Sequence, residues 1–142
     1  MNDRLAVTQQ KDKNMGKLKV LDLFSGIGGF SVGLEKTNGF ETVAFCELDQ
    51  RAHPILQRSW PNVPIFNDVM ELNNEQLHAA GVGRIDVVCG GFPCQDISAA
   101  WDGPGLAGKR SGLWFEYARI IGELQPKYAI IENVGNLRKR RR

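Results

Sequence analysis

Cysteine, histidine and long apolar runs are all scarce in this sequence. Its 142 residues include three cysteines and two histidines, and three cysteines are too few for the disulfide framework that stabilises small secreted domains. No apolar run approaches the ~18 residues that a membrane-spanning helix needs, and the amino terminus lacks the apolar stretch of a signal peptide. Hydrophobic residues make up 42% and charged residues 24% of the chain, which excludes collagen-like and disordered classes. We therefore expect a soluble, cytoplasmic protein with a single core and no membrane partner.

A broad basic surface is lacking as well. The formal net charge is +2, but the last five residues, 138–142, are all Lys or Arg. Without them the chain carries 13 Lys and Arg against 16 Asp and Glu, a net charge of −3. Such a body is poorly suited to bind nucleic acid by itself, and a short basic terminus is more often a solvated tail than a binding site. We expect a flexible extension at 1–17, a body at 18–137 and a basic tail at 138–142.

Short apolar runs alternate with amphipathic segments along the body. The runs typical of strands lie at 17–24, 40–46, 65–66, 85–89 and 128–131, and the helical patterns lie at 29–37, 49–59, 73–80 and 113–124. A glycine-rich loop without periodicity is expected at 90–112. Strands that alternate with helices favour a parallel sheet with right-handed crossovers and helices on both faces. The predicted fold is a doubly wound α/β sheet.

Glycine, carboxylate or thiol follows each of the five expected strands, where such sheets bind their ligands. Glycines 26, 28 and 29 allow a ligand to approach the backbone, although Ser31 stands where a dinucleotide pattern wants a third glycine. Glu47, 21 residues beyond Gly26, is placed to accept ribose hydroxyls. Asp68 is equally well interpreted as an acceptor for an adenine amino group or as a helix cap. This pattern indicates a nucleoside ligand rather than a pyrophosphate.

Cys94 is the candidate nucleophile. It follows Pro93 in the glycine-rich loop, where its thiol is expected at the mouth of the cleft, whereas Cys46 and Cys89 lie on apolar strands and are expected in the core. Glu132 and Asn133 follow the neighbouring strand, which would bring a carboxylate into the same cleft. The histidines and cysteines have no metal-ligand spacing, so no metal is expected.

In order and spacing, these motifs resemble those of the DNA cytosine-5 methyltransferase family. The resemblance covers residues 20–134 and rests on 22–30 (DLFSGIGGF), Glu47, Asn67 with Asp68, 90–98 (GGFPCQDIS), 110–116 (RSGLWFE) and 132–134 (ENV). It implies a Rossmann-like fold, a role in restriction–modification and S-adenosyl-L-methionine as cofactor. The residues that it implies for cofactor binding are Phe24, Ser25, Gly26, Ile27, Gly28, Gly29, Glu47, Leu48, Asp68, Val69, Pro93 and Leu113.

The resemblance also implies a covalent mechanism on a flipped cytosine. The Cys94 thiolate would add to ring carbon 6, so that carbon 5 can attack the methyl group. Glu132 would hold a proton on ring nitrogen 3, and Asn133 would orient that carboxylate or the base edge. Gln95 and Ser98 would line the base pocket, and Arg110 would contact a phosphate.

Family members continue beyond the ENV motif with an arginine-bearing strand, a target-recognition domain and a helix that returns to the cofactor turn. We therefore expect a chain truncated after the fifth strand, as a piece of a longer enzyme or, less favoured, as one subunit of a split enzyme with a complementary C-terminal subunit. Double-stranded DNA is the expected substrate of the complete enzyme, and RNA stays open. A remnant that binds S-adenosylmethionine or a partner without turnover is the alternative. A nicotinamide oxidoreductase is disfavoured by Ser31 and by the Pro93, Cys94 pair.

Overall fold

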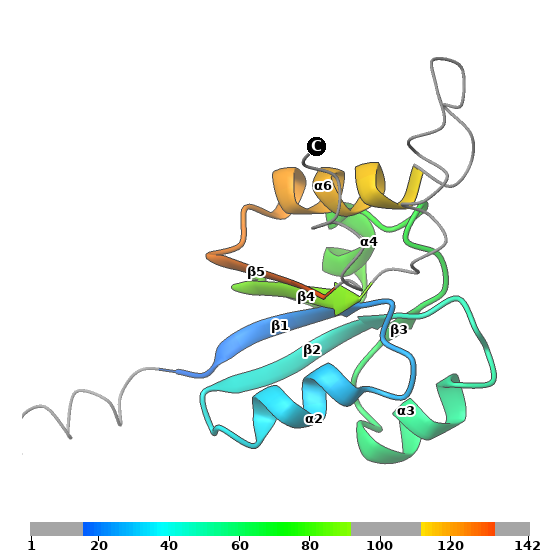
Figure 1. Cartoon of the computed structure of the whole chain (residues 1–142), viewed down its shortest axis with the longest axis vertical. Coiled ribbons are helices and arrows are strands. Elements are labelled where there is room, and N and C mark those ends of the chain that lie inside the picture. Colours follow the sequence, from blue (N-terminus) through cyan, green and yellow to red (C-terminus); the bar gives the residue numbers. More distant parts are fainter. Residues whose placement is uncertain (1–15, 92–111, 133–142) are drawn as a thin grey trace, which may run out of the picture.

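The computed structural model describes residues 16–91 and 112–132, which form a parallel five-stranded sheet with the order β3-β2-β1-β4-β5 (Figure 1). The strands are β1 (Leu18–Leu23), β2 (Phe40–Cys46), β3 (Ile65–Phe66), β4 (Val87–Gly91) and β5 (Tyr128–Glu132). The helices are α2 (Gly29–Glu35), α3 (His53–Ser59), α4 (Asn74–Ala79) and α6 (Gly112–Leu124). The chain winds outward from β1 to β3 and then continues on the other side of β1, so the topological switch point lies between β1 and β4.

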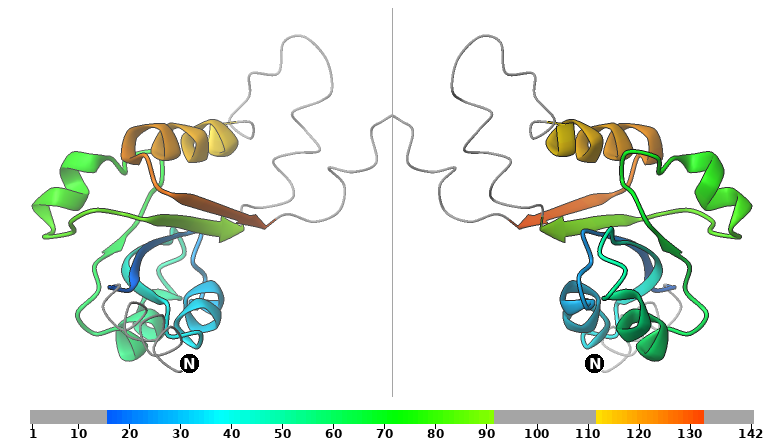
Figure 2. Two further views of the ribbon diagram at one scale, coloured as in Figure 1. Left: turned by 90° about the vertical axis from the view of Figure 1, so that its left-hand side faces the viewer. Right: turned by 90° about the vertical axis from the view of Figure 1, so that its right-hand side faces the viewer.

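Helices cover both faces of this sheet. Helices α2 and α3 lie on one face and α4 and α6 on the other (Figures 1 and 2). On the α6 face, strand residues such as Leu21 and Val88 pack with Tyr117 and Ile120 of the helix in the larger apolar cluster. On the α2 face a smaller cluster centres on Val20, Val87 and Cys89. The doubly wound α/β fold predicted from the alternating pattern is confirmed.

The predicted element boundaries differ from the structure mainly at two places. The helix expected at 49–59 begins only at His53, because the Asp49 carboxylate accepts the Arg51 backbone N–H and closes a turn before it. The strand expected at 85–89 runs instead from Val87 to Gly91. Gly90 and Gly91, expected in the following loop, pair in register with Ile131 and Glu132 of β5.

Gly90 explains why a glycine can belong to this strand. A Cβ atom on Gly90 would lie 2.1 Å from the backbone carbonyl oxygen of Leu23 on β1, and φ at Gly90 is +152°. A side chain would therefore collide with backbone rather than with a mobile group. Glycine lets β1 and β4 approach closely at the switch point, beside the edge where ligands bind in such sheets.

Candidate functional site

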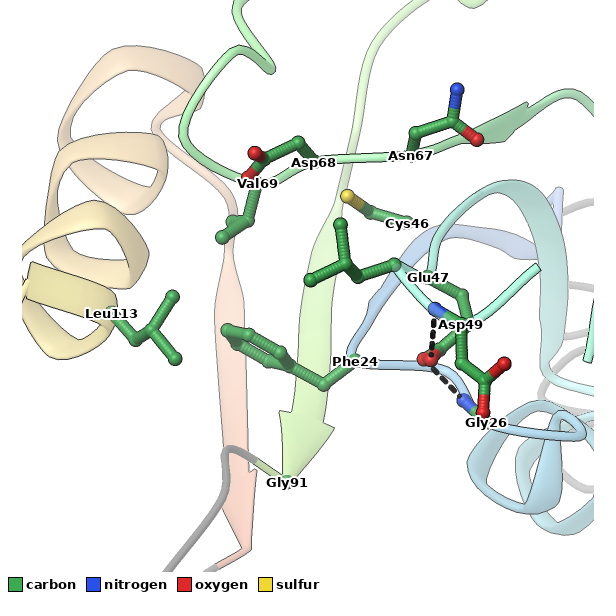
Figure 3. Close-up of a pocket in the computed structure, with 11 residues that line it drawn as sticks. Phe24, Gly26, Cys46, Glu47, Asp49, Asn67, Asp68, Val69, Gly91 and Leu113 are labelled. Atoms are coloured by element: carbon green, nitrogen blue, oxygen red, sulfur yellow. Dashed lines mark hydrogen bonds between the residues drawn. The ribbon is translucent and has the colours of Figure 1, made fainter. Parts of the chain in front are cut away.

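A pocket of about 470 Å³ lies at the carboxyl ends of the strands (Figure 3). Its volume falls in the range of small-molecule sites, roughly 300–1,000 Å³. The residues that line it come from the ends of β1, β2, β3 and β4 and from the start of α6: Phe24, Gly26, Cys46, Glu47, Leu48, Asp49, Asn67, Asp68, Val69, Gly91 and Leu113. Segments that are distant in sequence thus meet at one edge of the sheet.

The turn after β1 forms one wall, and its backbone conformation is unusual. Phe24, Gly26 and Gly28 all have positive φ values, of 52°, 53° and 89°, and such a conformation is strained for a side chain as large as phenylalanine. The Ser25 hydroxyl helps to fix the turn by donating to the carbonyl of Asp22 at 2.5 Å. Because the turn is locked in this way, the Phe24 ring and the backbone of Gly26 both face the pocket.

Glu47, at the end of β2, is held by the backbone on both sides. Its Oε2 accepts the Gly26 N–H at 2.8 Å and its Oε1 accepts the Asp49 N–H at 3.0 Å (Figure 3). The His53 Nε2 lies 2.7 Å from the Glu47 carbonyl oxygen, which ties the start of α3 to the same residue. The carboxylate is thereby oriented at the pocket, and each of its oxygens can accept a further bond from a ligand hydroxyl.

Apolar side chains form the other half of the pocket. In Figure 3 Phe24 and Leu113 point toward one another, and Val69 lies beside the gap between them. Tyr117 stacks on Phe24 with ring centroids 6.3 Å apart and an interplanar angle of 12°, which limits the movement of the Phe24 ring. Leu48 lines the same pocket and is 71% exposed. These walls can hold a flat heteroaromatic ring between apolar surfaces.

Asp68 lies at the pocket, but it is not the cap of the helix that follows, which was one of its two interpretations. Its Oδ1 accepts the Met70 N–H at 2.9 Å, so the side chain caps the turn that follows β3. The same residue lines the pocket. The N-cap of the next helix is a different residue, Asn73, whose side chain accepts the Gln76 N–H.

Glu132 lies on β5 opposite Gly91, beside the pocket. An added Cβ on Gly91 would lie 2.5 Å from Oε2 of Glu132, so this carboxylate sits directly against the Gly91 backbone. The other residues predicted for catalysis and substrate binding, and one predicted for the cofactor, lie outside the described part of the chain: Pro93, Cys94, Gln95, Ser98, Arg110 and Asn133.

The cysteines of the described segments are buried, as their positions on apolar strands suggested. Cys46 lines the pocket but is only 2% exposed, and burial, with Asp68 and Glu47 nearby, raises the pKa of its thiol to about 12. Burial raises the pKa of the Cys89 thiol as well. Neither thiol is a thiolate near neutral pH, so neither is suited to act as a nucleophile.

The residues expected to bind the cofactor and the residues that line the pocket are not the same at every position. Four residues predicted for the cofactor are not on the pocket wall: Ser25, Ile27, Gly28 and Gly29. Conversely, Asp49, Asn67, Cys46 and Gly91 line the pocket without having been chosen for it. Asp49, Asn67 and Gly91 could have been predicted, because they lie at or just after the ends of strands. Cys46 could not, because its apolar neighbours in the sequence indicate a core position.

The described residues contain no group of three or more His, Cys, Asp or Glu side chains arranged to hold a metal ion. Within the same ranges, no helix has both the length and the apolar character needed to cross a membrane.

Comparison with known proteins defines the class to which this fold and pocket belong. The family of C-5 cytosine-specific DNA methylases matches residues 18–142, and the chain belongs to that family. S-adenosylmethionine is the methyl donor of the family, and the expected cofactor class is thereby confirmed.

Curated relatives include the type II methyltransferases M.AluI of Cellulosimicrobium cellulans and M.HhaI of Haemophilus parahaemolyticus. The chain is 41% identical to M.AluI over 127 residues, which are 88% of this chain and 24% of that protein. It is 35% identical to M.HhaI over 126 residues, which are 89% of this chain and 36% of that protein. The chain thus spans about a quarter to a third of the length of these relatives.

Solved structures share the fold. A prophage-encoded DNA modification methyltransferase from E. coli superimposes with a TM-score of 0.70 at 32% identity, over 87% of this chain and 34% of that chain. The Dnmt2 methyltransferase of S. pombe has a TM-score of 0.65 at 22% identity, over 87% of this chain and 36% of that chain, a likeness of fold alone.

Proposed function

We propose that this chain is the cofactor-binding and catalytic part of an enzyme that transfers a methyl group from S-adenosylmethionine to carbon 5 of cytosine in DNA. The observation that carries the proposal is the pocket itself, which joins the backbone-held carboxylate of Glu47 to an apolar slot and has Glu132 beside it. The combination suits a nucleoside next to a site of base chemistry.

The pocket residues fit S-adenosylmethionine in both chemistry and size. The Glu47 oxygens would accept the two ribose hydroxyls, and Asp68 would accept from the adenine amino group. The adenine would lie between Leu48 and Leu113, with Phe24, Val69 and Pro93 at its side and the backbone of Gly26 close to the ligand. When bound, the cofactor supplies a methyl group on a positively charged sulfur.

Cys94 and Glu132 would activate the cytosine. The Cys94 sulfur forms a bond to ring carbon 6, and a proton held on ring nitrogen 3 by Glu132 balances the charge that develops. Carbon 5 would become electron-rich and form the new bond to the methyl carbon, while the bond from that carbon to the cofactor sulfur would break with its electron pair left on sulfur, so that S-adenosylhomocysteine leaves. Loss of the carbon 5 proton to a base and cleavage of the sulfur–carbon 6 bond then release methylated cytosine and the thiolate. Asn133 would orient Glu132 or the base edge.

A cytosine inside a duplex cannot reach these groups, so the base must be flipped out. Gln95 and Ser98 would line the pocket for the flipped base, and Arg110 would contact a phosphate. With a net charge of −3 outside its basic tail, this chain would need further protein surface to hold double-stranded DNA.

A complementary C-terminal polypeptide is the proposed source of that surface, either covalently continuous with this chain or as a separate subunit. Two observations support it. The chain spans only 24% of the length of M.AluI and 36% of that of M.HhaI. In addition, β5 ends the described sheet, with Tyr128 58% and Ile131 40% exposed, and an exposed edge strand is a surface that a further strand can join.

Tritiated methyl transfer to unmethylated duplex DNA tests the proposal. The chain is assayed alone and with the C-terminal segment of a matched type II methyltransferase, each with wild-type Cys94 and with Cys94→Ala. We expect no transfer by the chain alone, and transfer by the wild-type pair that the substitution abolishes. Transfer by the isolated chain above its alanine control would contradict the need for a complement, and transfer by the Cys94→Ala pair would contradict the mechanism.

A further inference from the structure

Arg119, in α6, connects that helix to the segment between β3 and α4. Its Nη2 donates to the backbone carbonyl of Val69 at 3.0 Å and to that of Leu72 at 2.8 Å. These acceptors lie 50 and 47 residues away in the sequence. One side chain therefore joins two parts of the fold that no strand pairing connects.

Two glutamates of the same helix fix the direction of this side chain. Nε of Arg119 donates to Glu116 at 2.6 Å, and Nη1 donates to Glu123 at 3.1 Å. Because a guanidinium is planar and its donors have fixed directions, two carboxylates on Nε and Nη1 leave little freedom for Nη2. The other oxygen of Glu123 accepts the Asn74 N–H at 2.8 Å, so the network reaches the start of α4.

The segment that receives these bonds has no regular secondary structure between β3 and α4. Its internal bonds are those of a single turn: the Asp68 carbonyl accepts the Glu71 and Leu72 N–H groups, and the Asp68 carboxylate accepts that of Met70. Such a turn keeps its own shape, and Val69 and Leu72 pack in the larger apolar cluster together with Tyr117 and Ile120 of α6. The side-chain bonds from α6 add fixed directions to this packing, which apolar contacts lack.

The same two elements each provide residues of the pocket wall. Asp68 and Val69, here called the Asp68 wall, lie at the start of the turn, and Leu113 lies in the first turn of α6. Arg119 is not among the residues that line the pocket. Its bonds to the Val69 and Leu72 carbonyls nevertheless hold the Asp68 wall to the helix that carries Leu113.

We propose that Arg119 is a positioning residue, which sets the separation between the Asp68 wall and Leu113 that the adenosine part of the cofactor requires. The inference rests on the proposed function, because it takes this pocket to be the cofactor site. It assigns to α6 a role in cofactor affinity through a side chain that does not touch the cofactor.

The test uses the whole chain with three substitutions. Arg119→Met keeps the apolar stem and removes the donors, and Arg119→Lys keeps the charge with fewer fixed donors. Arg84→Met is the matched control, because Arg84 also forms an ion pair, with Asp86 just before β4, at the opposite end of the sheet. For each protein, amide hydrogen exchange is followed without ligand, and the dissociation constant of S-adenosylhomocysteine is measured by calorimetry.

We expect Arg119→Met to speed exchange at residues 68–74 while β1 and β2 keep their protection. We also expect its dissociation constant to rise roughly tenfold. The variant loses two hydrogen bonds from a charged donor, and these bonds hold a wall of the pocket rather than the ligand itself. Arg119→Lys should fall between it and the wild type in both measurements, and Arg84→Met should match the wild type. If the methionine variant does not fold, the lysine variant carries both measurements.

Unchanged exchange at residues 68–74 would overturn the proposal, because the turn would then not depend on Arg119. Faster exchange with an unchanged dissociation constant would overturn it as well, because the position of the Asp68 wall would not matter to the ligand. A wild-type chain that binds no S-adenosylhomocysteine would instead contradict the proposed function of the pocket, and the exchange result would still support or overturn the positioning by Arg119.

Discussion

Glu47 and Asp68 both place a carboxylate at the end of a strand, but the backbone holds them differently. Glu47 accepts two backbone N–H groups through separate oxygens, whereas Asp68 accepts that of Met70 within its own turn. A carboxylate fixed on both sides has lost its rotational freedom before any ligand arrives. A ribose held by Glu47, as proposed, would therefore incur little further cost in side-chain entropy.

Glu47→Ala should weaken the binding of S-adenosylmethionine. Hydrogen bonds to a charged acceptor contribute roughly 1.5–3 kcal/mol each, so loss of the ribose bonds should raise the dissociation constant by at least about tenfold. Calorimetry on the purified chain measures this directly. The control is Glu41→Ala, on β2 but at the opposite end of the strand, which should leave the affinity unchanged. An unchanged affinity for the Glu47 variant would remove that residue from the site.

The buried carboxyl of Asp22 should make the free energy of unfolding depend on pH. Its carboxyl is 1% exposed, and burial raises its pKa to about 6, although a hydrogen bond from the Ser31 hydroxyl (2.7 Å) opposes the shift. Between about pH 4 and 6 the folded protein holds a proton that the unfolded chain has released. The contribution of Asp22 to the free energy of unfolding therefore falls as the pH rises through this window, by on the order of 3 kcal/mol in total.

Denaturant titrations of the wild type and Asp22→Asn at a series of pH values test this prediction. The asparagine variant should gain stability relative to the wild type as the pH rises from 4 to 6, and the difference should level off above the pKa of about 6. Other carboxyl groups cancel in this comparison, because both proteins contain them. A difference between the two proteins that does not vary with pH would contradict the assignment.

At the scale of elements, β4 shows where glycine is required and α6 shows where it is tolerated. In β4, a side chain on Gly90 would meet the Leu23 carbonyl, and φ is +152°. In α6, an added Cβ on Gly122 would meet nothing within 4 Å. The same substitution should therefore have opposite effects at the two positions.

Gly90→Ala should destabilise the protein by roughly 3 kcal/mol or more, since it forces two strands apart at a strained φ. Gly122→Ala should stabilise it by about 1 kcal/mol, because alanine has the higher helix propensity. Thermal or denaturant unfolding of both variants measures the difference. Equal effects of the two substitutions would show that the close approach of β1 and β4 is not a constraint.

The alternation of apolar runs and amphipathic segments was sufficient to predict the elements and the sheet, because each pattern is local. The bounds of β2 and β3 agree with the predicted ranges. The pairing of Gly90 and Gly91 with β5 was not predictable in the same way. Glycine-rich composition is typical of loops, and that these two glycines belong to a strand is seen only from their pairing with the neighbouring strand.

In the site, too, local motifs were predictable and long-range contacts were not. Glu47, Asp68 and Leu113 were predicted from motifs, and the structure brings all three to one pocket. The contacts that support the site were missed. Trp60 packs against the turn so closely that a Cβ on Gly28 would lie 2.7 Å from its ring, and Arg119 reaches carbonyls 50 and 47 residues away. Such contacts join elements distant in sequence, and no local spacing encodes them.

Across the described part of the molecule, large apolar side chains remain exposed at several places, and two of these places bear on association. Ile27 and Val32 are 63% and 42% exposed beside the turn after β1, and Tyr128 and Ile131 are exposed on β5. Adjacent exposed apolar residues favour association, and an unpaired edge strand favours it further. The purified chain should therefore associate with itself.

Sedimentation velocity should show an apparent mass that rises with concentration. Ile131→Lys should reduce the association, because a charge on an edge strand opposes strand pairing, while Lys127→Arg just before the strand should not. A chain that is monomeric at every concentration would contradict this reading of the exposed surfaces.

Covalent trapping on duplex DNA that contains 5-fluorocytosine tests whether Cys94 attacks the cytosine. Fluorine at carbon 5 cannot leave as a proton does, so an enzyme that has attacked carbon 6 and transferred the methyl group stays bound to the base. The chain is incubated with the DNA, S-adenosylmethionine and a C-terminal complement, and the adduct is mapped by peptide mass. We expect an adduct on Cys94 that is absent from Cys94→Ala; an adduct formed by the alanine variant, or one mapped to another residue, would show that Cys94 is not the nucleophile.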